Sequence, residues 1–269
     1  ERQPRPGSRR NGGTPRVKRV VKIGGRAQGD PALPAALAAA ARQPGTSLVI
    51  VHGGGDEVTA LQRRLGNEPR FVGGRRVTTA DDLLVVRMVL SGAINKRLVR
   101  QLLDVGVRAV GVSGEDAAML PALPLDDGAL GAVGEPVAAD PALLHALLAG
   151  GFVPVVSPLG RHAVTGEGLN VNGDDAAAAL AVALGADELL LLADVAGVLD
   201  PAGAVLPDLD VCGVGSLIAS GVARGGMTAK LQAARRAQAG GVATIRIGDA
   251  RALLDATRGT RITHSPTAA

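Results

Sequence analysis

Residues 47–65, SLVIVHGGGDEVTALQRRL, decide the fold of this chain. The apolar run 47–51 predicts a buried strand, and residues 55–65 predict a helix. Between them lies a run of three glycines, where backbone N–H groups can converge on an anion at the start of the helix. The same run suits a plain tight turn, so by itself it predicts only that a strand passes directly into a helix.

The alternation of strands and helices continues along the chain. Further strands are expected at 20–23, 107–112, 152–156, 188–193, 243–247 and 260–263. Helices are expected at 31–42, 79–105, 140–149, 174–184, 214–220 and 227–239, and a β-hairpin at 70–77. Thr79 and Asp82 form a capping box at the start of the longest helix. This order predicts an α/β three-layer sandwich with a mainly parallel central sheet, and ligands just beyond the carboxyl ends of its strands.

The composition excludes several classes of protein. The 269 residues include two Phe, no Trp and no Tyr, which argues against modules that stack nucleic-acid bases on aromatic side chains. The single Cys212 excludes an internal disulfide framework and a cysteine-based zinc site. No apolar run approaches the roughly 18 residues of a membrane-spanning helix. We therefore expect a cytoplasmic protein that is not bound to a membrane.

The positive charge is concentrated at the beginning of the chain. A net charge of +4 and a pI of about 10 suggest a nucleic-acid partner. However, residues 1–19 hold seven basic residues and one acidic residue, so the rest of the chain carries a net charge of −2. Residues 1–18 are rich in Pro, Gly and Arg and predict a disordered basic tail, and residues 264–269 predict a second disordered tail. We expect no nucleic-acid partner.

Lysine is rare in this chain. There are 25 Arg but only four Lys, at positions 18, 22, 96 and 230. An ammonium is a compact, mobile point charge and a guanidinium is a planar fork, so a position that keeps Lys can require the ammonium. Lys18 lies in the predicted tail, which indicates that chance also retains lysines. Lys230 is different, because a cation in the first turn of a helix opposes the helix dipole unless an anion binds there.

A cluster of polar residues, NVNGDD at 170–175, precedes an alanine-rich helix. An Asp at this point is often only a helix cap, but one cap does not need so many polar residues and glycines. The chain has no Walker A loop, and no GxGxxG follows a predicted strand. P-loop and dinucleotide-binding functions are therefore disfavoured.

Six motifs stand in an order that resembles the amino acid kinase superfamily, and within it the acetylglutamate kinases. They are KIGG at 22–25, HGGG at 52–55, RVT at 76–78, NVNGD at 170–174, DVAGVLD at 194–200 and GGMTAK at 225–230. The resemblance covers residues 19–263. It implies an amino acid kinase or carbamate kinase-like fold with two lobes. The N-lobe, 19–168, would bind the acetylamino acid and form the dimer, and the C-lobe, 169–263, would bind ATP.

The resemblance also implies roles for single residues. Lys22 and Lys230 are similar to the lysines that stabilise the transferring phosphoryl group, and Asp174 is similar to the aspartate that holds them. The residues implied for ATP and its phosphates are Gly24, Gly25, Asp194, Val195, Gly197, Val198, Leu199 and Arg224. No protein ligand for a metal is implied, because the Mg²⁺ ion is held by ATP.

The implied reaction moves the γ-phosphoryl group of ATP to the γ-carboxylate of N-acetyl-L-glutamate, in arginine biosynthesis. Main-chain N–H groups of Gly54 and Gly55 would receive the acceptor, and Arg76 and Asn170 match the groups that bind its α-carboxylate. A carboxylate is ionised at pH 7 and needs no strong base. The catalyst has mainly to neutralise and align two anions.

Two other functions stay open. An α-aminoadipate derivative, acetylated or linked to a carrier protein in lysine biosynthesis, differs by one methylene, which is a small basis for discrimination. The basic residues that would suit an acidic carrier are Arg63, Arg64, Arg70 and Arg75. A non-catalytic amino-acid sensor could share the fold, although the intact pair Lys22 and Lys230 favours an enzyme.

Two regions of the sequence receive simpler interpretations. We expect His52 to form hydrogen bonds at the end of its strand rather than to act as a base. The helix at 79–105 matches the dimer contact of the family, so we expect a homo-oligomer that is at least a dimer. The Pro/Gly-rich start of the chain favours a dimer without arginine inhibition over an arginine-responsive hexamer.

Overall fold

The computed structural model describes residues 17–263, so residues 1–16 and 264–269 of the two predicted tails lie outside the described part. Strand β1 (Val17–Ile23) begins three residues earlier than the sequence predicts. The backbone N–H of Lys18 donates to Asp187 Oδ2 at 2.7 Å, and its Nζ donates to the carbonyl oxygen of Leu184 at 2.7 Å. Lys18 thus belongs to the sheet and binds the end of a helix, so residues 17 and 18 are part of the fold and not of a tail.

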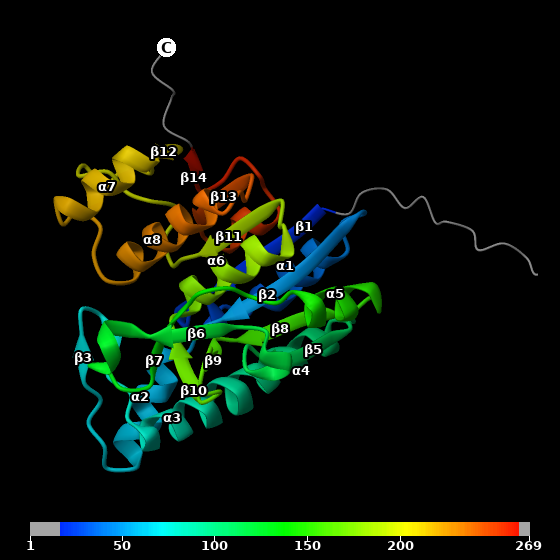
Figure 1. The fold of residues 1–269 in the computed structure, drawn as a ribbon. Coiled ribbons are helices and arrows are strands. Elements are labelled where there is room, and N and C mark those ends of the chain that lie inside the picture. Colours follow the sequence, from blue (N-terminus) through cyan, green and yellow to red (C-terminus); the bar gives the residue numbers. More distant parts are fainter. Residues whose placement is uncertain (1–16, 264–269) are drawn as a thin grey trace, which may run out of the picture.

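One sheet of eight strands runs through the molecule (Figure 1). Its order is β12 (Asp208–Asp210), β14 (Thr260–Thr263), β13 (Thr244–Gly248), β11 (Glu188–Leu192), β1, β2 (Thr46–His52), β8 (Val153–Ser157) and β5 (Ala109–Ser113). The strands from β13 to β5 are parallel, and β14 and β12 run the opposite way. The predicted mainly parallel sheet is confirmed, with a short reversed edge.

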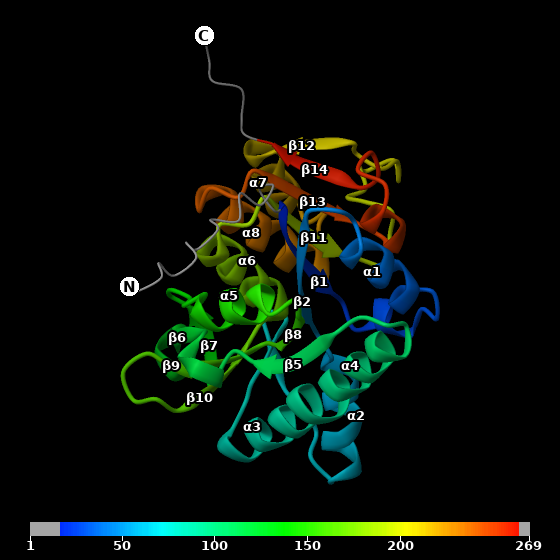
Figure 2. The ribbon, with the colours of Figure 1, turned by 90° about the vertical axis from the view of Figure 1, so that its right-hand side faces the viewer.

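Helices cover both faces of the sheet, as Figures 1 and 2 show. Helices α5 (Ala142–Ala149), α6 (Gly173–Leu184) and α8 (Gly226–Ala239) pack on one face, with α7 (Val211–Ala219) beside α8. Helices α1 (Leu33–Ala41), α2 (Gly55–Arg64), α3 (Ala80–Arg87) and α4 (Asn95–Asp104) contribute to the core on the other side. Within β1, Val20 belongs to the first core and Val21 to the second, because successive strand side chains point to opposite faces. The three-layer architecture is confirmed.

The longest predicted helix is not a single α-helix. It begins at the predicted capping box, in which Thr79 Oγ1 accepts from the N–H of Asp82 and the Asp82 carboxylate accepts from the N–H of Thr79. Between α3 and α4, residues Met88–Ile94 form a π-helical stretch. Such stretches are uncommon in helices and often lie beside functional sites.

Four short strands were not predicted. They are β6 (Pro121–Pro124), β7 (Val133–Pro136), β9 (Leu159–His162) and β10 (Gly168–Val171), which pair in a closed ring. The predicted hairpin is present as β3 (Phe71–Val72) and β4 (Arg75–Arg76). None of the helices within residues 17–263 is long and apolar enough to cross a membrane.

Candidate active site

Three charged side chains meet beyond the carboxyl ends of the central strands. Lys22 lies near the end of β1, Asp174 in the first turn of α6, and Lys230 four residues after α8 begins. Asp174 Oδ1 is 2.9 Å from Lys22 Nζ and 3.1 Å from Lys230 Nζ. The three residues are at most 7% exposed. The structure therefore brings together the three residues that the sequence singles out for catalysis.

The surroundings of this cluster shift two of its pKa values. Burial alone would raise the pKa of Asp174, but the ammonium groups of Lys22 and Lys230 outweigh it and hold the pKa below its usual range. Burial, assisted by the nearby charge of Lys22, lowers the pKa of Lys230 to about 8. A buried aspartate that keeps its charge is a suitable anchor for two ammonium groups.

The start of α6 explains why the Asp174 carboxylate is available. The side chain of Asn172 caps the helix, accepting from the N–H groups of Asp174 at 2.8 Å and Asp175 at 3.3 Å. Asp174 is therefore not the cap, and its carboxylate is free to bind both lysines. Of the two interpretations that the sequence allows, the simple capping role falls to Asn172.

A cleft of about 890 Å³ opens from this cluster between β11, α7 and α8. Lys22, Asp174 and Lys230 line its polar end together with Gly24 and Gly25. The apolar lining residues are Leu192, Val195, Val198, Leu199, Leu217, Val222 and Met227. The cleft thus combines charged groups, including Asp56, Asp194 and Asp200, with an apolar wall, and its size suits a nucleotide.

Most of the residues predicted for ATP lie on this cleft. Asp194, Val195, Val198, Leu199 and Arg224 line it. The prediction for Gly197 is not supported, because this residue is not part of the lining. A Cβ at Gly197 would lie 2.6 Å from Val205 Cγ1 and 2.7 Å from Thr260 Oγ1, so its small size serves packing. The sequence analysis gave no binding role to Leu217, an apolar helix residue outside every motif, or to Met227, which lies inside the GGMTAK motif.

A second cavity of about 260 Å³ adjoins the first, and the two share Lys22, Gly25 and Gly55 in their linings. The four residues predicted for the acceptor, Gly54, Gly55, Arg76 and Asn170, all line this second cavity. Position 54 leaves little room for a side chain, because a Cβ there would meet the buried side chains of Ile94 and Leu90 in the π-helical stretch. Lys22, and with it the cluster of Lys22, Asp174 and Lys230, thus lies where the large cavity meets the small one.

Arg76 is firmly held by its neighbours. Its Nη2 donates to the carbonyl oxygen of Gly55 at 2.8 Å and to Thr59 Oγ1 at 2.7 Å, and its Nη1 donates to Gln62 Oε1. The guanidinium carbon lies 4.8 Å from the centre of the Phe71 ring. Burial lowers the pKa of Arg76, and the charges of Asp82 and Asp56 oppose this. Arg76 consequently fixes the glycine loop as well as lining the cavity.

His52 lies beneath the glycine loop. It is fully buried, its Nδ1 is 3.0 Å from the carbonyl oxygen of Gly53, and its Nε2 is 3.2 Å from Asn95 Nδ2. Burial lowers the pKa of His52 to about 4, although the hydrogen bond to Gly53 acts in the other direction. The imidazole is therefore neutral at pH 7. This geometry confirms the expected hydrogen-bonding interpretation of His52.

Comparison with known proteins agrees with this geometry. The amino acid kinase family matches residues 18–249. A protein named acetylglutamate kinase from Jannaschia sp. (strain CCS1) is 44% identical over 235 residues, which are 86% of this chain and 82% of the relative. The solved structure of smu.665 from Streptococcus mutans UA159 is similar with a TM-score of 0.81 and 32% identity, covering 91% of this chain and 98% of that one.

A more distant structure extends the comparison to the fold alone. Giardia carbamate kinase has a TM-score of 0.71 and 18% identity, covering 94% of this chain and 100% of that one. The predicted carbamate kinase-like fold is thereby confirmed. From its sequence match over most of its length and its three-layer fold, the chain belongs to the amino acid kinase family.

Proposed function

We propose that this chain transfers the γ-phosphoryl group of ATP to the γ-carboxylate of N-acetyl-L-glutamate, as a step of arginine biosynthesis. The products are ADP and N-acetyl-L-glutamyl 5-phosphate. The observation that carries the proposal is the cluster of Lys22, Asp174 and Lys230 at the junction of a nucleotide-sized cleft and a smaller cavity. The name and 44% identity of the Jannaschia relative support the choice of acceptor.

In the proposed mechanism the chain does not need to remove a proton. An oxygen of the ionised γ-carboxylate forms a bond to the γ-phosphorus while the bond from that phosphorus to the β,γ-bridging oxygen breaks. The bridging oxygen leaves with ADP and takes the electron pair. Because two anions approach each other, catalysis depends on positioning and on neutralising charge.

The two lysines do this together, since both ammonium groups contact Asp174 Oδ1. Each ammonium has three N–H donors, and the contact with Asp174 occupies only part of this capacity. The remaining donors of Lys22 and Lys230 bind oxygens of the transferring phosphoryl group. Asp174 keeps the two like charges together before ATP arrives and is not itself a base.

The acceptor binds in the smaller cavity. Main-chain N–H groups of Gly54 and Gly55 receive it, since the absence of a Cβ lets the substrate approach the backbone. Arg76 and Asn170 bind its α-carboxylate, and the Asn170 amide is oriented by donating from Nδ2 to Thr78 Oγ1 at 3.1 Å. These contacts align the γ-carboxylate with the two lysines.

A kinase of this family acts on a nucleotide that carries a divalent metal, and we propose that the metal is Mg²⁺. Residues 17–263 contain no group of three or more His, Cys, Asp or Glu side chains placed to hold a metal ion. In our proposal the ion enters on the phosphates of ATP and keeps several waters, which is the usual coordination of Mg²⁺. When bound it neutralises charge on the β- and γ-phosphates.

We also propose that the protein is a cytoplasmic homodimer. Three large apolar side chains along α3, the π-helical stretch and α4 are more than half exposed. They are Leu84, Met88 and Leu103. A second copy of the same helical segment would cover them. Gel filtration with and without arginine tests this: a dimer is expected in both conditions, and an arginine-dependent hexamer or a monomer would contradict it.

The proposed reaction is tested by trapping its acyl phosphate. Hydroxylamine converts an acyl phosphate into a hydroxamate, which is measured against ADP released from ATP. With acetylglutamate we expect one hydroxamate per ADP, and with acetylaminoadipate a kcat/KM at least tenfold lower. Equal or greater activity on the aminoadipate compound would support the lysine-pathway alternative. Binding of acetylglutamate without any turnover would support the sensor.

A further inference from the structure

Arg75 lines the acceptor cavity beside Arg76. The sequence analysis grouped Arg75 with the basic residues that would suit an acidic carrier. In the structure its side chain is only 22% exposed and is turned toward the protein. Its Nη2 donates to Asp175 Oδ2 at 3.1 Å. This contact connects the β3–β4 hairpin with the start of α6, so Arg75 has a defined position at the edge of the cavity.

Asp175 is itself held on several sides. Its backbone N–H donates to Asn172 Oδ1, and its second carboxylate oxygen pairs with Arg236 of α8. Arg236 also donates to Glu135 of β7 at 2.7 Å. Asp175 is 3% exposed, and a carboxylate this deeply buried is stable as an ion only with such partners. The chain of contacts therefore fixes Arg75 from the side away from the cavity.

The other terminal nitrogen of Arg75 is different. Among the described residues, Arg75 Nη1 is buried and has no hydrogen-bond partner. Buried N–H groups without a partner are rare in native proteins, so this one calls for an explanation. Arg76, by contrast, already donates to three protein acceptors. Of the two arginines that line the cavity, Arg75 therefore keeps an unused donor group, whereas Arg76 is largely committed.

We propose that Arg75 is a second acceptor-binding residue, whose Nη1 donates to the α-carboxylate of the substrate, with Asp175 as the positioning residue that holds its Nη2. The inference rests on the proposed function and deepens it. The non-reacting carboxylate then lies between two guanidinium groups, and the γ-carboxylate extends toward Lys22, which lines the same cavity. The acceptor class is a dicarboxylate with a free α-carboxylate, since a neutral group would leave both arginines poorly satisfied.

The test combines two variants with two acceptors. The acceptors are acetylglutamate and its α-carboxamide analogue, and the variants are Arg75→Gln and Arg75→Lys. For Arg75→Gln we expect the KM for acetylglutamate to rise at least tenfold while the KM for ATP stays within twofold. In the same Arg75→Gln variant, the preference for the free α-carboxylate over the α-carboxamide should fall about tenfold. Arg75→Lys should keep part of this preference, because lysine retains the positive charge but lacks the planar fork of arginine.

Arg235→Gln is the matched control. Arg235 is exposed and lines a neighbouring basic pocket together with Arg75, but it does not line the acceptor cavity. This variant should keep both KM values and the preference for the carboxylate. Asp175→Asn should reproduce the rise in acceptor KM in weaker form, because Arg75 remains but is no longer held by an anion.

The assignment would be overturned if Arg75→Gln left both the KM for acetylglutamate and the preference for the α-carboxylate unchanged. It would also be overturned if Arg235→Gln raised this KM and reduced this preference as much as Arg75→Gln does. A fall in kcat alone would show a merely structural role and would also overturn it. If Arg75→Gln does not fold, the carboxamide comparison on Arg75→Lys decides alone. If the unsubstituted chain makes no hydroxamate from acetylglutamate, the proposed function fails together with this inference. If it makes hydroxamate and Arg75→Gln has the same KM and preference, only this inference fails.

Discussion

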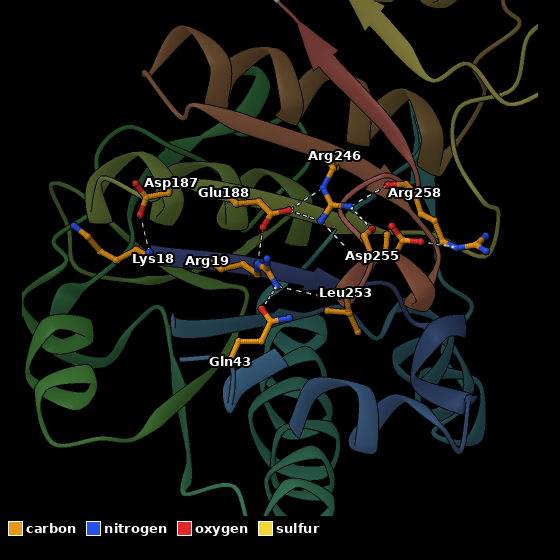
Figure 3. Close-up of polar contacts among 10 residues, drawn as sticks. Lys18, Arg19, Gln43, Asp187, Glu188, Arg246, Leu253, Asp255 and Arg258 are labelled. Carbon is orange, nitrogen blue, oxygen red and sulfur yellow. Dashed lines mark hydrogen bonds and ion pairs between the residues drawn. The ribbon is translucent and has the colours of Figure 1, made fainter. Parts of the chain in front are cut away.

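Two acids in this protein each lie between two basic side chains, toward opposite ends of the same strands. Near the carboxyl ends, Asp174 lies between Lys22 and Lys230. Toward the amino ends, Glu188 lies between Arg19 and Arg246, as Figure 3 shows. Both clusters are buried and both have an excess of one positive charge, yet one uses ammonium groups and the other guanidinium groups.

The two clusters differ in what else their bases bind. Arg246 donates to Glu188 and also to the carbonyl oxygens of Ala252, Asp255 and Arg258, so it fastens the turn that precedes β14 (Figure 3). The lysines bind Asp174 and face a cleft of about 890 Å³. A guanidinium with all its directions occupied stabilises structure, and an ammonium with donors remaining can bind a ligand.

This difference refines the argument from lysine content. Lys18 binds the last carbonyl of α6, where a cation is favourable, and Lys96 Nζ donates to the carbonyl oxygen of Gly111 at 3.1 Å. These two lysines have local structural partners. The rarity of lysine thus marked positions where an ammonium has a defined partner. Only the structure shows that Lys22 and Lys230 share a buried carboxylate beside a cleft, whereas the other two bind backbone carbonyl groups.

The largest effect expected in either cluster is that of Asp174→Asn. Without the carboxylate the two buried ammonium groups repel each other and lose their anchor, so kcat should fall by two to three orders of magnitude. The hydroxamate assay measures this. Asp208→Asn, which removes an exposed partner of Arg261, is the control and should keep full activity. A fall in kcat of less than tenfold in Asp174→Asn would contradict a catalytic role for the cluster of Lys22, Asp174 and Lys230.

The second cluster should respond in stability rather than in rate. Arg246→Met leaves Glu188 and three carbonyl groups short of a partner, and the free energy of unfolding should fall by about 4 kcal/mol. Urea denaturation measures it, with kcat per folded molecule within twofold of the original. Arg251→Met, at an exposed arginine of the same region, should cost little. A folded Arg246→Met with strongly reduced kcat would break the distinction between the two clusters.

His52 predicts a pH dependence of stability. Its pKa is about 4 in the folded chain and about 6.5 when unfolded, so the unfolded state binds the proton more readily between these values. The contribution of His52 to the free energy of unfolding is fully present above pH 6.5. It is lost as the pH drops toward 4, by about 3 kcal/mol in total. His52→Gln should remove this slope from urea titrations, whereas His145→Gln, at an exposed position, should retain it. An unchanged slope in His52→Gln would contradict a buried neutral imidazole.

The smallest expected effect is on the pH profile of the unsubstituted enzyme. With a pKa of about 8, Lys230 loses its charge as the pH rises through that value. The kcat/KM for ATP should therefore decline above pH 8, approaching tenfold for each further unit. A profile that stays flat to pH 10 would mean that Lys230 keeps its charge or is not needed.

Sequence reasoning located the site better than the surrounding fold. The glycine runs at 24–25 and 53–55 could be placed because each follows a strongly apolar strand, and Lys22 because it lies near the end of the first of these strands. Such strands end at one edge of a parallel sheet. Strands β6, β7, β9 and β10 could not be predicted, because each has four residues and depends on pairing with partners distant in the chain. The role of Asn172 as the cap, the pairing of Asp175 with two arginines and the packing role of Gly197 likewise required three-dimensional neighbours.

In the proposed reaction, transfer to a carboxylate requires an ammonium group at position 230. The most direct measurement is the rate of hydroxamate formation by Lys230→Arg with saturating ATP and acetylglutamate, beside Lys96→Arg. We expect at least a tenfold loss of kcat in Lys230→Arg, because the planar fork cannot replace a compact charge between Asp174 and the phosphate. Lys96→Arg should keep full activity. Turnover of Lys230→Arg near that of the unsubstituted chain would contradict this requirement.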